Sequence, residues 1–141
     1  MVKNVLEYLE ASAQKYPDKI AVADDKSVMT YLQLYLAAYN IAVDLTEHTN
    51  CRQPVLVYMD KNCNTLAAFM GIVMAGCFYV CLDTSQPQQR INAIIKMLNP
   101  KVIITDEKLT AKCEEFEFAG EVFSIQTLLE NTEGFEDKEL F

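Results

Sequence analysis

The sequence is poor in glycine, with four glycines in 141 residues and no cluster among them. Loops that hold nucleotide phosphates are rich in glycine, because backbone amides must approach the phosphate oxygens closely. Neither of two common phosphate-loop patterns, G-x-G-x-x-G and G-x-x-x-x-G-K-[ST], occurs. The sequence therefore contains no recognisable phosphate-binding loop.

Residues that bind metals or act as nucleophiles are also scarce. The only histidine is His48, and the five cysteines form no C-x-x-C motif. No serine or cysteine stands in a recognisable nucleophile motif. We expect free thiols that pack as small apolar groups, with Cys77 and Cys81 on a strand of the core. The sequence thus predicts no catalytic residue, no cofactor-binding residue and no metal ligand.

Long apolar runs are absent, and none approaches the ~20 residues that a membrane-spanning helix needs. Glu7 and Glu10 interrupt the N-terminal region where a signal peptide would be apolar. The net charge of −8 disfavours nucleic acid and anionic membranes as partners. We expect a cytoplasmic protein, and its 51% hydrophobic content is enough for a real core.

A strand–helix–strand unit over residues 54–83 is the clearest feature that is present. Residues 55–59 form a short apolar run rich in β-formers, which is typical of a fully buried parallel strand. Apolar residues then recur at helical spacing from a cap at Asn62 or Asn64. Gly76 stands where a left-handed residue ends a helix, and a second buried strand follows it. The unit predicts a right-handed βαβ crossover.

The remaining pattern alternates helices with short strands. A helix that stops near Tyr16 precedes a small hairpin, and Thr30 with Gln33 forms a capping box for a long second helix. Pro87 is a candidate for the first turn of a further helix, with Ser85 as its candidate cap. Further elements are predicted at residues 102–105 (strand), 108–113 (helix), 121–124 (strand) and 125–129 (helical turns). We predict an α/β fold: a mainly parallel sheet with helices on both faces, and the hairpin at one edge or beside it.

Aspartates end three of the predicted strands: Asp60, Asp83 and Asp106. Because the carboxyl ends of parallel strands share one edge of the sheet, these carboxylates are candidates for a magnesium site. Aspartate is also common where a strand ends and the next helix is capped, and we favour this second interpretation. Phe78 and Tyr79, as strand neighbours, are expected to pack on opposite faces of the core.

Two stretches resemble the first two core motifs of the adenylate-forming superfamily, which includes nonribosomal peptide synthetase adenylation domains, D-alanine–carrier protein ligases and acyl-CoA synthetases. Residues 29–34, Met-Thr-Tyr-Leu-Gln-Leu, resemble L-T-Y-x-E-L. Residues 73–83, Val-Met-Ala-Gly-Cys-Phe-Tyr-Val-Cys-Leu-Asp, resemble L-K-A-G-x-A-Y-V-P-[LI]-D. The motif positions interpreted as architectural are Thr30, Tyr31, Gly76, Tyr79 and Asp83.

The chain also departs from these motifs. Met74 replaces the usual lysine, Cys81 replaces the usual proline, and Thr84 replaces a proline that often follows the aspartate. A residue other than proline after the aspartate is similar to D-alanine ligases, as are residues 128–131. These details favour activation of an amino acid over activation of a fatty acid.

The resemblance implies that residues 1–129 are the N-terminal α/β subdomain of an adenylation domain. Residues 130–141 would be an acidic linker toward a phosphate-loop region beyond Phe141. The full-length enzyme would use ATP and magnesium to adenylate a carboxylate, and pass the acyl group to the phosphopantetheine thiol of a carrier protein. This piece alone would be a scaffold without catalysis, and the native reading frame should continue past it.

Alternative classes remain at this point. One is a fragment of an acyl-CoA synthetase. Another is a receiver-like signalling module, with Asp24 and Asp25 as its acidic pair and Asp60 as phosphoacceptor. A third is a non-catalytic docking module.

Replacing Gly76 with valine should strongly destabilise the fold. A β-branched residue does not readily adopt the positive φ expected at this helix end, and a bulky side chain would push helix and strand apart. The expected loss in the free energy of unfolding is a few kcal/mol, typical of strained backbone combined with overpacking. A denaturation midpoint equal to that of the unsubstituted chain would mean that the helix does not end there.

Overall fold

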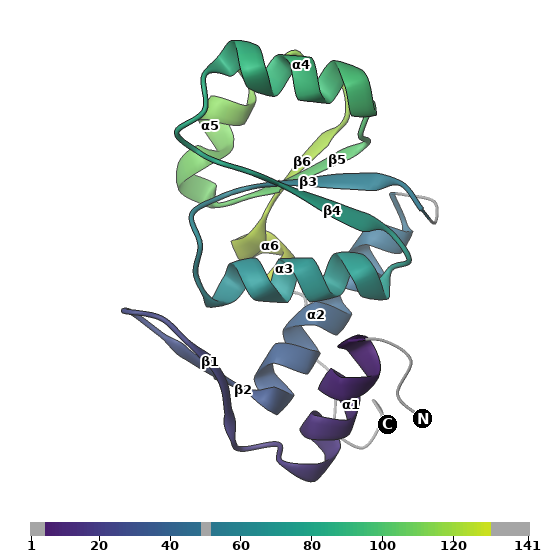
Figure 1. Ribbon diagram of the computed structural model, residues 1–141, viewed down its shortest axis with the longest axis vertical. Helices are drawn as coiled ribbons and strands as arrows, with labels where there is room; N and C mark the ends of the chain where they lie inside the picture. Colours follow the sequence, from purple (N-terminus) through teal and green to yellow (C-terminus); the bar gives the residue numbers. More distant parts are fainter. Residues whose placement is uncertain (1–4, 49–51, 131–141) are drawn as a thin grey trace.

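The computed structural model describes residues 5–48 and 52–130 (Figure 1). The helices are α1 (Val5–Lys15), α2 (Tyr31–Thr46), α3 (Cys63–Met74), α4 (Gln88–Leu98), η1 (Glu107–Leu109, a 3-10 helix), α5 (Thr110–Cys113) and α6 (Ile125–Glu130). The strands are β1 (Ile20–Ala23), β2 (Val28–Thr30), β3 (Pro54–Tyr58), β4 (Phe78–Leu82), β5 (Val102–Thr105) and β6 (Glu121–Ser124). Apart from Glu130, which ends α6, the predicted linker of residues 130–141 lies outside the described residues.

A four-stranded parallel sheet in the order β4-β3-β5-β6 is the centre of the fold. In Figure 1, α4 and α5 lie on one side of the sheet, and α2, α3 and α6 lie on the other. The predicted α/β class, with a parallel sheet and helices on both faces, is confirmed. The antiparallel hairpin β1-β2 is a separate sheet and lies apart from the main one (Figure 1).

The two central strands explain why both faces need helices. Every residue from Val55 to Tyr58 and from Val102 to Thr105 is buried. Successive side chains of a strand point to opposite faces. Val55 and Val57 accordingly join the core beneath α2 and α3, whereas Leu56 and Tyr58 join the core beneath α4 and α5. The continuous apolar run in the sequence is the signature of a strand covered on both sides.

Helices α2 and α3 pack closely because Gly71 has no side chain. A Cβ atom placed on Gly71 would lie 2.7 Å from the Cβ atom of Ile41 and 2.9 Å from the carbonyl oxygen of Ala38. Both Ile41 and Ala38 are fully buried. The glycine therefore sets how near the two helices can approach.

Helix α3 begins and ends as the sequence predicts. Asn62 caps it by accepting from the backbone N–H groups of Asn64 and Thr65. At the other end Gly76 has φ 83°, and its N–H donates to the carbonyl of Val73 at 3.0 Å. The N–H of Cys77 donates to the carbonyl of Ile72 at 3.1 Å, which completes the Schellman pattern. The expected positive φ at Gly76 is confirmed.

Strand β4 differs from the prediction of a buried strand. It lies at the edge of the sheet, and both Phe78 and Tyr79 are exposed, at 45% and 43%. Their placement on opposite faces holds, since Tyr79 stacks on Phe69 of α3 with ring centroids 4.2 Å apart. Cys77 is buried as expected, but Cys81 is exposed, so its assignment to the core was wrong. A short apolar run is compatible with an edge strand as well as with a central strand, so the sequence pattern could not show which of the two β4 is.

The predicted cap of α4 at Ser85 is also wrong. Pro87 occupies the N-cap position and its side chain makes no capping bond. The Ser85 N–H and hydroxyl both donate to Asp83 instead, at 2.9 and 2.7 Å. The helix ends at Asn99, which is left-handed with φ 48° and precedes a proline that cannot continue the helix.

The hairpin is tied to the body at both ends. The Thr30 and Gln33 capping box is formed, with bonds of 3.1 and 2.9 Å, so that β2 leads directly into α2. Asp24 accepts from the backbone N–H of Cys63, the first residue of α3, at 2.8 Å. It also accepts from the N–H groups of Lys26 and Ser27 at 2.8 and 2.9 Å. These backbone donors, Cys63 first, hold the pKa of Asp24 well below its usual range.

Four cysteines lie in the described part of the chain, and none of them is in a disulfide, as expected: Cys63, Cys77, Cys81 and Cys113. Among the same residues, no helix combines the length and apolarity needed to cross a bilayer.

Gly71→Ala should lower the free energy of unfolding even though alanine is the better helix former. The gain in helix propensity is about 1 kcal/mol. Overpacking against the Ile41 side chain and the Ala38 carbonyl should cost about 1–3 kcal/mol and outweigh it. Chemical denaturation monitored by circular dichroism measures the difference. Met97→Ala, at a site 75% exposed on α4, is the control and should change stability by no more than about 0.5 kcal/mol. A stabilised Gly71→Ala chain would contradict the close contact.

Asp24→Asn should destabilise the chain at neutral pH, and the effect should fade in acid. A carboxylate whose pKa is lowered by folding contributes stability above its unfolded pKa, which is near 4. That contribution is lost as the pH falls through the lower, folded pKa. Denaturation midpoints of the unsubstituted chain and Asp24→Asn should therefore differ at pH 7 and converge below about pH 4. Asp25→Asn, on the exposed neighbour, is the matched control, and a pH-independent difference for Asp24→Asn would refute the role.

Candidate functional site

The carboxyl ends of β3 and β5 are the place where an α/β sheet usually carries its ligand. The chain leaves β3 for α3 on one face of the sheet, and leaves β5 for η1 and α5 on the other. Ligands in open α/β sheets bind at such a switch point, outside the carboxyl ends of the strands. We therefore take this edge as the candidate site.

A hollow of about 500 Å³ lies beside the carboxyl ends of β3 and β4. Its lining consists of Met59, Asp60, Lys61, Cys81, Leu82, Asp83 and Thr84. Inside it the hydroxyl of Thr84 donates to the Asp60 carboxylate at 3.1 Å. Asp60 was interpreted as a possible helix cap, but Asn62 caps α3 and Asp60 instead links the two strand ends.

The other two strand-end aspartates are occupied by protein donors. Asp83 accepts from Ser85, whose backbone N–H and hydroxyl lower the pKa of the carboxyl, with a smaller contribution from Lys61. Asp106 caps η1 through the Lys108 N–H at 2.9 Å, and accepts from the Gln126 amide at 3.1 Å. Within residues 5–48 and 52–130, no three His, Cys, Asp or Glu side chains are placed to hold a metal ion. The favoured interpretation, in which the aspartates cap or end elements, therefore holds for two of them. Asp106 caps a helix, and Asp83 stabilises the turn after β4.

Tyr58 and Thr105 hold the strand ends in register, and sequence reasoning missed both. The Thr105 hydroxyl, fully buried, donates to the Tyr58 carbonyl on the neighbouring strand. The Tyr58 hydroxyl donates to the Thr84 carbonyl at 3.3 Å, and its ring meets Phe116 edge to face with centroids 5.1 Å apart. Burial raises the pKa of the Cys113 thiol. A polar residue ending an apolar strand was the one signal that pointed to Thr105.

The five motif positions are spread over the molecule. Thr30 and Tyr31 lie where the hairpin meets α2, and Gly76 and Tyr79 lie where α3 turns into β4. Only Asp83 lies at the carboxyl edge, in the wall of the hollow. The structure does not bring these residues together, and each has a local structural partner or role instead.

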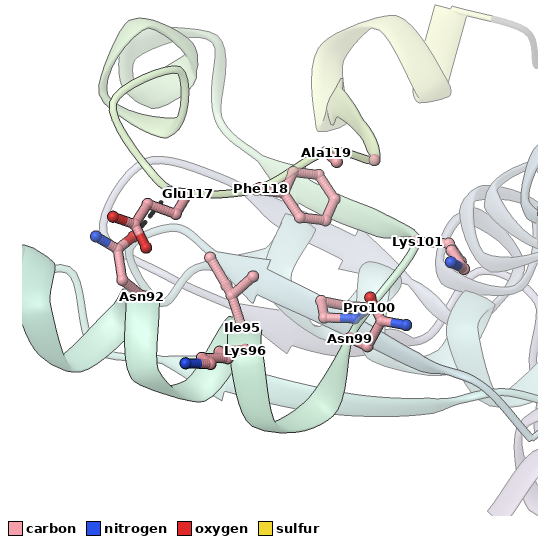
Figure 2. Close-up of a pocket in the computed structure, with 10 residues that line it drawn as sticks. Asn92, Ile95, Lys96, Asn99, Pro100, Lys101, Glu117, Phe118 and Ala119 are labelled. Atoms are coloured by element: carbon pink, nitrogen blue, oxygen red, sulfur yellow. Dashed lines mark hydrogen bonds between the residues drawn. The ribbon is translucent and has the colours of Figure 1, made fainter.

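A second hollow, of about 340 Å³, lies at the opposite edge of the sheet, near the amino ends of β5 and β6. Figure 2 shows Ile95, Pro100 and Phe118 around it, together with the bond from the Glu117 N–H to the Asn92 side chain at 2.8 Å. A Cβ atom on Gly120 would meet the Lys101 carbonyl oxygen and the Phe118 ring, so this glycine serves a close backbone approach. The hollow lies away from the switch point.

The carboxyl-edge hollow does not fit the phosphates of a nucleotide. A phosphate cradle needs several free backbone amides converging at close range. The carboxyl-edge hollow has no glycine among its lining residues, and its aspartates would repel phosphate. This hollow therefore provides no cradle for nucleotide phosphates, and no catalytic step is assigned to its residues.

Comparison with known proteins identifies the family. A model of the AMP-binding enzyme family matches residues 9–140. The D-alanine–D-alanyl carrier protein ligase of Staphylococcus aureus (strain MRSA252) is 30% identical over 127 residues, which is 89% of this chain and 24% of the ligase. The NRPS-like oxidoreductase fscA of Fusarium equiseti is 35% identical over 101 residues, covering 71% of this chain and 10% of that protein.

A solved structure agrees with these relatives. The nonribosomal peptide synthetase FmoA3 (S1046A), bound to alpha-methyl-L-serine-AMP, superposes with a TM-score of 0.80 at 27% identity, over 89% of this chain and 14% of its own. The chain thus spans a quarter or less of each of these three proteins. The motif resemblance is confirmed. The receiver-like alternative is overturned, because β1, which precedes Asp24 and Asp25, is not a strand of the parallel sheet. The matched family model covers nearly all of the chain, and the chain belongs to the AMP-binding enzyme family.

Proposed function

We propose that this chain is the N-terminal α/β subdomain of an amino-acid-activating ligase and serves as a scaffold within it. Residues 1–129 would form the subdomain, and residues 130–141 would lead toward the phosphate loop. The observation that carries the proposal is the second motif: it folds into the Schellman turn and β4, while the strand ends hold no nucleotide cradle. The motif is therefore architectural here, and the chemistry belongs to other segments.

The whole enzyme would join a carboxylate to the α-phosphate of ATP and release pyrophosphate. The acyl group would then move to the phosphopantetheine thiol of a carrier protein, releasing AMP. ATP is the substrate of the family, and FmoA3 has also been solved with AMPPNP. Magnesium and a carrier protein are part of the proposal by the same reasoning, since one relative is a carrier-protein ligase and others are peptide synthetases.

An amino acid is the proposed substrate rather than a fatty acid. The relatives named for amino-acid chemistry, D-alanine ligases and peptide synthetases, match between 71% and 89% of this chain. Fatty acid AMP ligases share the fold, but at 21% identity or less they say nothing of substrate. The departure at Thr84 from the proline that often follows the aspartate points the same way.

The isolated 141-residue chain should be inert in amino-acid-dependent exchange of pyrophosphate into ATP. The reason is the absence of a phosphate cradle from the residues that would have to supply it. The polypeptide encoded by the complete native reading frame should catalyse the exchange with at least one amino acid. Circular dichroism of the isolated chain controls for folding. Exchange by the isolated, folded chain would refute the scaffold role, and exchange by the complete polypeptide with fatty acids alone would favour the acyl-CoA synthetase alternative.

A further inference from the structure

Strand β4 presents an open edge without the usual protection against pairing. In the described part of the chain it has a neighbouring strand, β3, on one side only. Edge strands are normally protected by charged side chains, proline or a bulge. Phe78–Leu82 contains no charged residue and no proline, and its register with β3 is continuous. The opposite edge, β6, carries the exposed Glu121, which pairs with His48 at 3.3 Å.

The backbone groups that face outward can be identified from one hydrogen bond. The Phe78 N–H donates inward, to the carbonyl of Gln53 at 3.2 Å. Hydrogen-bonding direction alternates along a strand that has a parallel neighbour. The N–H and carbonyl groups of Tyr79 and Cys81 therefore point away from β3, toward the open edge.

The residue at position 81 decides whether this edge can pair. The family motif has proline there, which has no N–H and so protects an edge strand. This chain has Cys81 instead, which restores a donor at the centre of the open edge. The substitution removes the one protective device that the motif would supply.

The edge is complementary to itself. In an antiparallel pair centred on Val80, Tyr79 of one copy lies opposite Cys81 of the other, and each such pair exchanges two main-chain hydrogen bonds. The flanking pair is Phe78 opposite Leu82, so every facing pair of side chains is uncharged. Such a pairing forms four main-chain bonds about a twofold axis, the symmetry of most homodimers.

Charge at the ends of the strand favours the same arrangement. Asp83 follows β4, and an antiparallel partner places it opposite Cys77 of the other copy. Arg52 lies beside that position, because its N–H donates to the Gly76 carbonyl at 2.7 Å. A parallel pairing would instead set Asp83 beside Asp83. We propose that the open edge of β4 binds a second copy of this chain through antiparallel β4–β4 pairing, joining two four-stranded sheets into one of eight.

Sedimentation velocity on the 141-residue chain under reducing conditions tests the proposal. The chain should form a concentration-dependent dimer, and Cys81→Pro should raise the dissociation constant at least about tenfold, because two of the four main-chain bonds are lost. Cys81→Ser keeps the N–H and is the matched control that should remain dimeric. A chain that is monomeric at all concentrations up to several hundred micromolar, or equal weakening by proline and serine, would overturn it.

Cys81→Pro could weaken the dimer simply by misfolding, so two further measurements test the pairing without this variant. Amide hydrogen exchange should show Tyr79 and Cys81 protected at high concentration and unprotected on dilution, while Val80, which bonds inward, stays protected in both states. Tyr79→Lys should dissociate the dimer, and Met97→Lys, on the exposed face of α4, should not. Protection of Tyr79 and Cys81 that does not change with concentration would refute pairing between copies. Because these measurements use the isolated chain, their failure leaves the proposed ligase role untouched.

Discussion

Burial of β3 and β5 on both faces is the constraint on which the rest of the fold depends. A strand whose every side chain is buried needs a helical layer on each side, and parallel neighbours need crossovers that supply those layers. The chain leaves β3 for α3 on one face of the sheet and leaves β5 for η1 and α5 on the other, so the two connections diverge at the carboxyl ends of these strands. The buried Thr105 hydroxyl, bonded to the Tyr58 carbonyl, satisfies the polar groups where the two strands separate.

The N-terminal third of the chain is attached to this sheet through α2 and α3. Gly71 allows α2 to reach van der Waals distance, and the carboxylate of Asp24 bonds the first amide of α3 from the hairpin. A two-stranded hairpin is only marginally stable alone. It is ordered here because its turn and its exit into α2 are both fixed by hydrogen bonds to the body.

The distribution of polar groups fits a supporting role. The aspartates at the carboxyl edge accept hydrogen bonds from Thr84, Ser85, Lys108 and Gln126. The hollow beside them has no glycine among its lining residues. Within residues 5–48 and 52–130, β4 has a neighbouring strand on one side only, and Cys81 stands there in place of the motif's proline. The same short strand therefore carries the family motif and the proposed contact with a second copy.

Local patterns in the sequence determined most elements of this protein, because caps and helix ends depend on near neighbours alone. The Thr30 capping box, the Asn62 cap and the left-handed Gly76 could all be predicted from a few adjacent residues, and the motifs around them indicated the family. Strand order was different: β3 and β4 have similar apolar sequences, and only pairing with distant β5 made β3 central and left Cys81 exposed. The Asp24 bond to α3 likewise joins residues far apart in the chain. Tertiary structure alone decided these features, since burial and long-range hydrogen bonds belong to the packed arrangement of elements and not to any one segment.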